Sequence, residues 1–265
     1  MHSQGASRLS FKLNMKQAAK EKGSNIVLAL DLPPSKPEEL LQAAQKILRA
    51  VHEEICALKI NRHLVLPLGL SGDLKKLLKQ AQDYGMPTIM DCKINDIGNT
   101  NRIIAEYYFK AGFNAVTANP FVGWKDGLES VFETAKHMNR GVILLVYMSH
   151  KGAWEGYGQE TLEQKTGKPI PQYRVFAQKA LEWGADGAVV GATYPEKIRE
   201  VYSILEDKVP IYAPGIGAQG GKIETAVRSR ASYLIVGRAI TLADDPAQAA
   251  KDFKLAARAS LNDAN

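Results

Sequence analysis

The segment IMDCKINDIGNT, residues 89–100, combines the end of an apolar run with three charged side chains, Asp91, Lys93 and Asp96. Side chains two residues apart in a strand point to the same side, so Asp91 and Lys93 are expected to face one cavity. A carboxylate and an ammonium held together can stabilise developing charge and transfer a proton. The spacing therefore favours an acid–base site, the alternative being a solvated turn between a strand and a helix.

A second cation is expected beside this pair. Lys59 ends the apolar run before the one that carries Asp91, so the two runs are predicted to be neighbouring strands. Each opposite pair of charges about 4 Å apart is worth about 4 kcal/mol at an effective dielectric constant of 20. A row of cation, anion and cation is therefore favourable. Asp96, in the expected turn, is poorly placed to reach the same site.

Two glycine-rich segments near the end of the chain favour an anion site. APGIGAQGG follows the seventh predicted strand, and LIVGRAIT belongs to the eighth. Glycines let backbone N–H groups approach an anion, and the guanidinium of Arg238 offers a fixed fork of donors. A glycine-rich turn alone is more often a plain turn, but beside an arginine it favours a phosphate group. The sequence contains no Walker motif, which argues against ATP.

Eight apolar runs alternate with amphipathic segments, and most runs are continuous, as in parallel strands covered on both faces. This order predicts an α/β fold, a (β/α)8 TIM barrel with an extra N-terminal helix over residues 8–22. One domain is expected over residues 1–265, with its core at about 25–260. An open doubly wound sheet is the alternative. The predicted strands span residues 25–31, 55–61, 87–93, 114–120, 141–148, 186–192, 210–215 and 232–238. The predicted helices span residues 36–51, 71–85, 98–112, 124–138, 173–184, 195–206, 220–230 and 246–260.

Barrel enzymes carry their chemistry at the carboxyl ends of the strands. The predicted strand ends here carry Asp31, Lys59, Asn61, Asp91, Lys93, Asn119, Ser149, Pro214, Gly237 and Arg238. Ionised groups at several of these ends favour a functional mouth over ordinary solvated turns. The long polar segment of residues 150–172 is expected to be a loop over one face rather than a linker.

The composition of the chain limits the expected class of ligand and the expected cellular location. The 265 residues are 45% hydrophobic, and the formal net charge is +6. Lys and Arg are spread along the chain, so an anionic small molecule is favoured over nucleic acid. No signal peptide is recognisable, and the longest apolar run, about eight residues, is too short to span a membrane, so a soluble cytoplasmic protein is expected. Cys56 and Cys92 are expected to be buried free thiols.

Metal and triad chemistry find little support in the sequence. The five histidines show no spacing typical of metal ligands, so neither a metal nor another cofactor is expected. Ser149 directly precedes His150, and neighbours along a chain rarely face each other productively, so a Ser/His/Asp triad is not expected either.

Taken together, these motifs resemble those of the orotidine 5′-phosphate decarboxylase family. DCKINDIGNT reads D-x-K-x-x-D-I-x-x-T, and LALD, LKIN, MSHKGA, PGIGAQGG and VGRAI follow in family order. The first motif is shared with related decarboxylases, whereas the complete set is highly specific. The resemblance implies cofactor-free decarboxylation of orotidine 5′-monophosphate to uridine 5′-monophosphate and CO2, the last step of pyrimidine nucleotide synthesis, in a homodimer.

The resemblance also implies roles for individual residues. The catalytic charge row would comprise Lys59, Asp91 and Lys93, with Asp96 supplied by the partner subunit. The implied substrate-binding residues are Asp31, which with Lys59 holds the ribose; Ser149, for the pyrimidine amide; Gln219, between phosphate and base; Pro214 and Ile216, which line the pocket; Gly237 and Arg238, for the phosphate; and Ile97 and Thr100, which cross the interface with Asp96.

Two other interpretations stay open. A sugar-phosphate decarboxylase or aldolase of the same barrel group shares D-x-K-x-x-D but uses Mg²⁺, with an acidic residue at the end of strand two. This chain has Lys59 there, and a cation would repel the metal. The other interpretation is a non-enzymatic nucleotide-binding barrel, although pure binding would not need Asp91 beside an anionic ligand.

Overall fold

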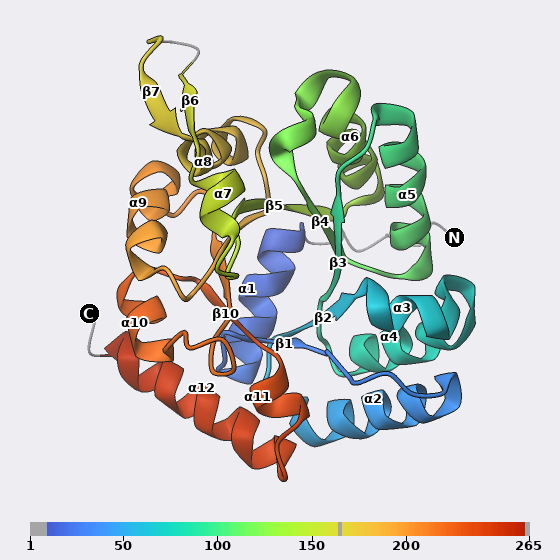
Figure 1. The fold of residues 1–265 in the computed structure, drawn as a ribbon. Helices are drawn as coiled ribbons and strands as arrows, with labels where there is room; N and C mark the ends of the chain where they lie inside the picture. Colours follow the sequence, from blue (N-terminus) through green and yellow to red (C-terminus); the bar gives the residue numbers. More distant parts are fainter. Residues whose placement is uncertain (1–9, 164–165, 263–265) are drawn as a thin grey trace, which may run out of the picture.

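Eight parallel strands close into a barrel surrounded by helices (Figure 1). The computed structural model describes residues 10–163 and 166–262. The strand order around the barrel is β1-β10-β9-β8-β5-β4-β3-β2, so the predicted (β/α)8 barrel is confirmed and the open doubly wound sheet is wrong. The barrel strands are β1 Ile26–Ala29, β2 Ala57–Asn61, β3 Thr88–Ile94, β4 Ala115–Ala118, β5 Gly141–Tyr147, β8 Gly187–Val190, β9 Ile211–Pro214 and β10 Tyr233–Val236.

Burial on both faces explains the continuous apolar sequences of the strands. Every residue of β1, β4, β5, β8 and β10 is buried. One face of each strand packs inside the barrel and the other packs under the helices, so no alternation of polar and apolar residues is required. Cys56 and Cys92 are buried free thiols, as predicted, and burial raises the pKa of each to about 12.

The helices around the barrel turn an apolar stripe inward. In α2 the buried residues include Leu40, Leu41, Ala44 and Leu48, which recur every three or four positions. Among the described residues, no helix is both long and apolar enough to cross a membrane. The helices that match predicted segments are α2 Pro37–Val51, α4 Leu74–Asp83, α5 Gly98–Ala111, α6 Glu129–Met138, α8 Gln172–Glu182, α9 Pro195–Leu205, α10 Ile223–Arg228 and α12 Pro246–Asn262.

Several short helical elements at strand ends are not predicted by the sequence. Helix α3 Arg62–Leu68 follows β2 and contains Pro67, and α11 Arg238–Thr241 follows β10 and is four residues long. Neither has room for a helical repeat of apolar residues. The helix predicted over residues 71–85 begins only at Leu74. The other short elements are η1 Gly69–Asp73 and η2 Pro120–Val122. The helix predicted over residues 124–138 is regular only from Glu129, because η3 Trp124–Leu128 is kinked at Lys125 and Asp126.

An N-terminal helix, α1 Phe11–Lys22, packs at the end of the barrel where the strands begin and crosses the centre of the ring in Figure 1. Phe11 and Met15 are buried, and a Cβ added at Gly141, the first residue of β5, would lie 2.5 Å from the Phe11 ring. Because Gly141 has no side chain, its backbone leaves room for the Phe11 ring of α1. The extra helix was predicted over residues 8–22, of which 8 and 9 lie outside the described residues.

The segment of residues 150–172 is not the loop that the sequence predicts. It contains α7 Ala153–Tyr157 and an antiparallel pair, β6 Glu160–Leu162 and β7 Pro169–Pro171, which projects beyond the ring of helices (Figure 1). The pair is closed by backbone hydrogen bonds between Glu163 and Lys168 and between Gly167 and Glu163. Strands of three residues are too short to give a recognisable sequence pattern, which is why the hairpin escapes prediction.

Candidate active site

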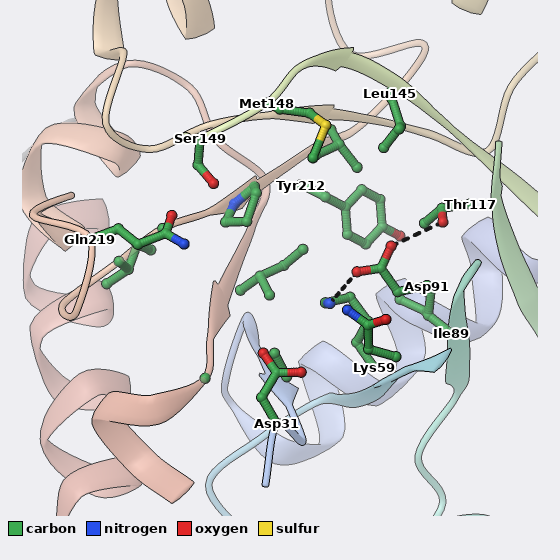
Figure 2. Close-up of a pocket in the computed structure, with 18 of the residues that line it drawn as sticks. Asp31, Lys59, Ile89, Asp91, Thr117, Leu145, Met148, Ser149, Tyr212 and Gln219 are labelled. Atoms are coloured by element: carbon green, nitrogen blue, oxygen red, sulfur yellow. Dashed lines mark hydrogen bonds and ion pairs between the residues drawn. The ribbon is translucent and has the colours of Figure 1, made fainter. Parts of the chain in front are cut away.

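A pocket opens at the carboxyl ends of the barrel strands (Figure 2). Apolar side chains from within the strands line its interior, and polar side chains from the strand ends line the rest, which is the usual place for chemistry in this fold. The predicted site residues that line it are Asp31, Lys59, Asp91, Lys93, Ser149, Pro214, Ile216, Gln219, Gly237 and Arg238.

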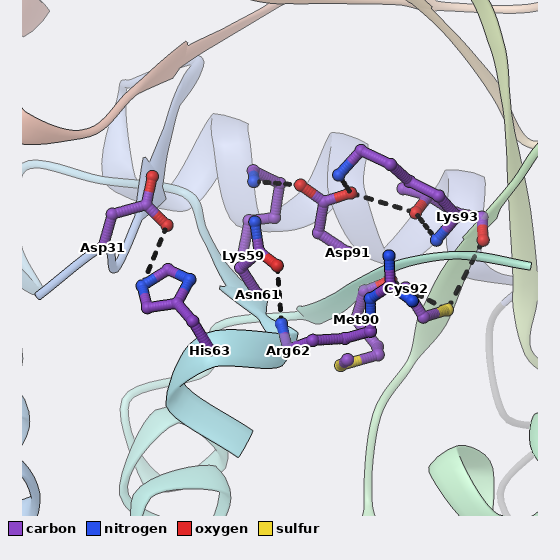
Figure 3. A network of polar contacts seen from close by, with 10 residues as sticks. Asp31, Lys59, Asn61, Arg62, His63, Met90, Asp91, Cys92 and Lys93 are labelled. Atoms are coloured by element: carbon purple, nitrogen blue, oxygen red, sulfur yellow. Dashed lines mark hydrogen bonds and ion pairs between the residues drawn. The ribbon is translucent and has the colours of Figure 1, made fainter. Parts of the chain in front are cut away.

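Lys59, Asp91 and Lys93 form a row of alternating charge in this pocket (Figure 3). Nζ of Lys59 lies 2.6 Å from Oδ2 of Asp91, and Nζ of Lys93 lies 2.7 Å from Oδ1. Lys59 and Asp91 are each only 8% exposed, so water screens their attraction little. Burial raises the pKa of Asp91, but the two ammonium groups lower it by more and hold it well below 3.8. Asp91 is therefore ionised at neutral pH, between two cations.

Strand β3 is irregular at Lys93. Its pairing with β4 changes register between Met90 and Ile94, and Lys93 has a φ of 51°, in the left-handed region that non-glycine residues avoid. The rule that residues two apart share a side therefore does not describe this segment, and an irregularity of the bulge type brings Lys93 back onto Asp91. The hydroxyl of Thr117 on β4 accepts from the Lys93 backbone N–H at 2.9 Å and donates to Oδ1 of Asp91 at 3.1 Å.

Asp31 stands at the mouth of the barrel, just beyond β1. Its Oδ1 atom is buried and has no hydrogen-bond partner among the described residues. Nε2 of His63, on α3, lies 3.9 Å from this oxygen, too far for a hydrogen bond (Figure 3). The backbone of Gly237 passes close by, since a Cβ there would lie 3.4 Å from Oδ2. Asp31 therefore presents an acceptor that a ligand hydroxyl could use.

Ser149 and Gln219 lie on the side of the pocket away from the charge row (Figure 2). They are brought together by two glycines. A Cβ at Gly191 would lie 2.6 Å from Cα of Ser149, and a Cβ at Gly215 would lie 2.8 Å from Oε1 of Gln219 and 2.9 Å from Cβ of Ser149. Gly215 also has a φ of 95°, which other residues rarely adopt. This pair offers a hydroxyl and an amide to a polar, planar ligand edge.

Gly237 and Arg238 lie where β10 gives way to α11, and both line the pocket. The side chain of Arg238 is exposed, so it is free to reach an anion at the mouth. The loop after β9 lies beside them and closes on itself through hydrogen bonds from Gly217 N to Gly221 O and from Gly221 N to Gly215 O, each 3.0 Å. These two loops occupy the positions where this fold commonly binds phosphate.

Asp96, Ile97 and Thr100 are not among the described residues that line this pocket. Asp96 is exposed, and Ile97 is 70% exposed. The turn is nevertheless held firmly by Asn101, which is fully buried: its Oδ1 accepts from Asp96 N at 3.0 Å, and its Nδ2 donates to Gly127 O at 3.0 Å and also to Asp96 O. These residues therefore form an ordered surface outside their own barrel's pocket.

The comparisons with known proteins agree on one family. Residues 24–253 match the model of the Orotidine 5′-phosphate decarboxylase / HUMPS family. The chain belongs to this family. It is 38% identical over 231 residues to the orotidine 5′-phosphate decarboxylase of Methanosarcina barkeri, covering 87% of this chain and 93% of that protein. It is also 38% identical over 226 residues to that of Pyrococcus horikoshii, covering 85% and 95%.

Solved structures of the family share the barrel. The orotidine 5′-monophosphate decarboxylase of Methanocaldococcus jannaschii, complexed with the inhibitor BMP, superimposes with a TM-score of 0.74 at 30% identity and covers 90% of this chain and 99% of that chain. A putative orotidine-monophosphate-decarboxylase from Toxoplasma gondii superimposes with a TM-score of 0.84 at 22% identity, covering 96% and 98%, and supports the fold alone.

Thr117 is a pocket residue that sequence reasoning missed. A threonine inside an apolar run is typical of an ordinary buried strand, because β-branched residues are common there. The register of β3 against β4 is what brings its hydroxyl to the charge row, and that register has no local signal in the sequence. Asn61, whose side chain accepts from Arg62 N at 2.6 Å, also lines the pocket; its place at a strand end was a usable signal.

Proposed function

We propose that this chain catalyses the decarboxylation of orotidine 5′-monophosphate to uridine 5′-monophosphate and CO2. The observation that carries the proposal is the Lys59–Asp91–Lys93 row, in which Lys59 and Asp91 are buried, at the mouth of a barrel of this family. A site that only bound a nucleotide would gain nothing from an ionised carboxylate beside an anionic ligand.

The rest of the pocket fits the parts of this substrate. Gly237 and Arg238 hold the phosphate, since the glycine exposes backbone and the guanidinium supplies paired donors. The hydroxyl of Ser149 and the amide of Gln219 lie together and bind the edge of the pyrimidine and its link to the phosphate. The unpaired carboxylate oxygen of Asp31 accepts a ribose hydroxyl.

The charge row supplies the chemistry. Loss of CO2 leaves a carbanion at C6 of the pyrimidine, which the ring π-system does not delocalise. The ammonium of Lys93 stabilises this charge and then donates the proton that completes the product. Asp91 lies beside the departing carboxylate, and the two anions repel by about 4 kcal/mol at an effective dielectric constant of 20. Enzymes supply about 8–23 kcal/mol, so repulsion is a minor part and phosphate binding must help to hold the row in place.

We also propose a homodimer in which the partner's Asp96, Ile97 and Thr100 complete each site. The exposed position of Ile97, with the turn fixed by a buried asparagine, supports this arrangement. On the adjoining helix α5, Ile103 and Tyr107 lie one turn apart and are 38% and 62% exposed. An exposed apolar stripe next to charged residues is typical of an interface, and a twofold axis would place the same turn at both sites.

We propose further that residues 1–265 act as one domain in the cytoplasm. The described part forms a single barrel on which α1 packs at one end and α12 packs against α10 and α2. The two buried, free thiols suit a reducing compartment.

An ultraviolet assay tests the function directly. Orotidine 5′-monophosphate loses its characteristic absorbance when the carboxylate leaves, and the chain should cause that loss at the same rate with and without a chelator. Inhibition by the chelator would favour the Mg²⁺-dependent relatives. Within the described residues no three His, Cys, Asp or Glu side chains gather as a metal site, and Lys59 stands where those enzymes need an acid. Tight binding of uridine 5′-monophosphate without any absorbance change would instead favour a nucleotide-binding protein.

A further inference from the structure

We infer that Thr117 is a positioning residue that fixes both Asp91 and Lys93 for the reaction. This inference rests on the proposed decarboxylase function and adds a residue to it. Thr117 lies on β4, beside the strand that carries the charge row, and only 1% of its surface is exposed. Its hydroxyl touches the row, and its side chain lines the same pocket.

A single hydroxyl group serves both members of the row. Oγ1 of Thr117 donates its proton to Oδ1 of Asp91 at 3.1 Å and accepts the backbone N–H of Lys93 at 2.9 Å. The same Oδ1 atom receives the ammonium of Lys93 at 2.7 Å, so the carboxylate is held from two directions on this side and by Lys59 on the other. The carboxylate plane cannot rotate without breaking at least one of these bonds.

The contact with the backbone matters because Lys93 is strained. Its φ of 51° costs a non-glycine residue free energy, and such a conformation persists only where the surroundings impose it. The ladder between β3 and β4 is interrupted between Met90 and Ile94, so the Thr117 hydroxyl takes the Lys93 N–H where the regular register fails. Thr117 therefore stabilises the backbone turn that directs the Lys93 side chain back over Asp91.

Thr88, on the neighbouring strand β3, provides a matched comparison. It stands at the opposite end of β3, is 3% exposed, and its Oγ1 donates to Oδ1 of Asn114 at 3.0 Å. Like Thr117, it is a buried threonine whose hydroxyl hydrogen bond is lost when valine replaces it, but it does not line the pocket. Any effect that Thr117→Val shows beyond Thr88→Val reports on the charge row rather than on the strand.

Thr117→Val keeps the branched shape and removes the hydroxyl. We expect kcat to fall by about 10- to 100-fold, because an outer partner that orients a reacting group typically contributes this much. KM and the affinity for uridine 5′-monophosphate should change by less than about threefold, since the phosphate and pyrimidine contacts are untouched. Thr117→Ser, which restores the hydroxyl, should recover kcat to within about threefold of wild type.

The measurement is steady-state kinetics on wild type, Thr117→Val, Thr117→Ser and Thr88→Val, with thermal unfolding of each. The expected result is a loss of kcat in Thr117→Val alone, while Thr117→Val and Thr88→Val lose similar thermal stability. If Thr117→Val does not fold, Thr117→Ala is measured in its place. The same loss of kcat, with KM nearly unchanged, is expected.

Two results would overturn the inference. Wild-type kcat in Thr117→Val, or in Thr117→Ala, would show that the hydroxyl positions nothing. A folded Thr117→Ser as impaired as Thr117→Val would assign the effect to packing of the methyl group. A wild-type chain without decarboxylase activity would be a different failure, because it would remove the proposed function itself and this role with it.

Discussion

Residues 89–100 have two halves, the end of β3 and the turn that follows it, which are built for different environments. The half with Asp91 and Lys93 is largely buried in the barrel mouth and is fixed by ion pairs and by Thr117. The half with Asp96 is exposed, and its backbone is fixed by Asn101. Both halves are ordered by a buried polar side chain, but only the first faces a pocket of its own chain.

This difference teaches how one short motif can serve two sites. A solvated turn would not need the fully buried Asn101, whose side chain bonds to the turn and also to Gly127 O in η3. An exposed turn that is held rigid is a preformed surface, and it loses little entropy when a second chain docks on it. The first half should therefore act within its chain and the second across an interface.

The largest effect should come from a substitution in the half with Asp91 and Lys93. In the proposed mechanism Lys93→Ala removes both the cation that stabilises the carbanion and the proton donor, so kcat should fall by about a thousandfold or more. Circular dichroism and binding of uridine 5′-monophosphate should show an intact fold. Turnover that survives this change would remove Lys93 as the acid.

A substitution in the half with Asp96 should lower kcat somewhat less. Asp96→Ala should lower kcat by about a hundredfold, because in the proposed dimer each charge row loses the carboxylate that the partner supplies. The proposed dimer should persist in sedimentation, since the substitution removes no apolar contact. The control is Asp83→Ala on α4, which breaks only an exposed pair with Lys79 and should leave kcat unchanged. Equal kinetics for the two variants would place Asp96 outside the chemistry.

Substitution at the phosphate end should act from a distance. Arg238→Ala touches no reacting atom, yet kcat/KM should fall by about a hundredfold because binding energy at the phosphate holds the substrate against the charge row. Arg228→Ala, an exposed arginine on α10, is the matched control and should behave as wild type. Wild-type efficiency in Arg238→Ala would contradict the assigned phosphate site.

The smallest effect concerns stability at low pH. The pKa of Asp91 is lower in the folded chain than in the unfolded chain, so its contribution to stability is present above the unfolded value and is lost as pH falls toward the folded value. Between pH 5 and pH 3 this loss should amount to roughly 1 kcal/mol in the free energy of unfolding. Urea unfolding should show a correspondingly flatter pH dependence for Asp91→Asn. An unchanged slope would mean that the ion pairs do not persist in solution.

Sequence reasoning predicts the barrel because its signal is repeated eight times and depends only on burial. It also predicts Lys59, Asp91 and Lys93 as a group, since strand ends of a barrel must converge. It fails at the irregular backbone of Lys93, because no residue type announces a positive φ there. It fails at Thr117 for a related reason: its function depends on the register between two strands, which is set by the whole barrel.

Mixed dimers of Lys93→Ala and Asp96→Ala chains test the central claim most directly. Each parent dimer should be nearly inactive, whereas a mixed dimer should have one site that combines an intact Lys93 with the partner's Asp96. Random reassociation at equal concentrations should therefore restore about a quarter of wild-type activity, since half of the dimers are mixed and each has one complete site. If Asp96 acted in its own barrel, every site would lack one residue, and mixing would restore nothing.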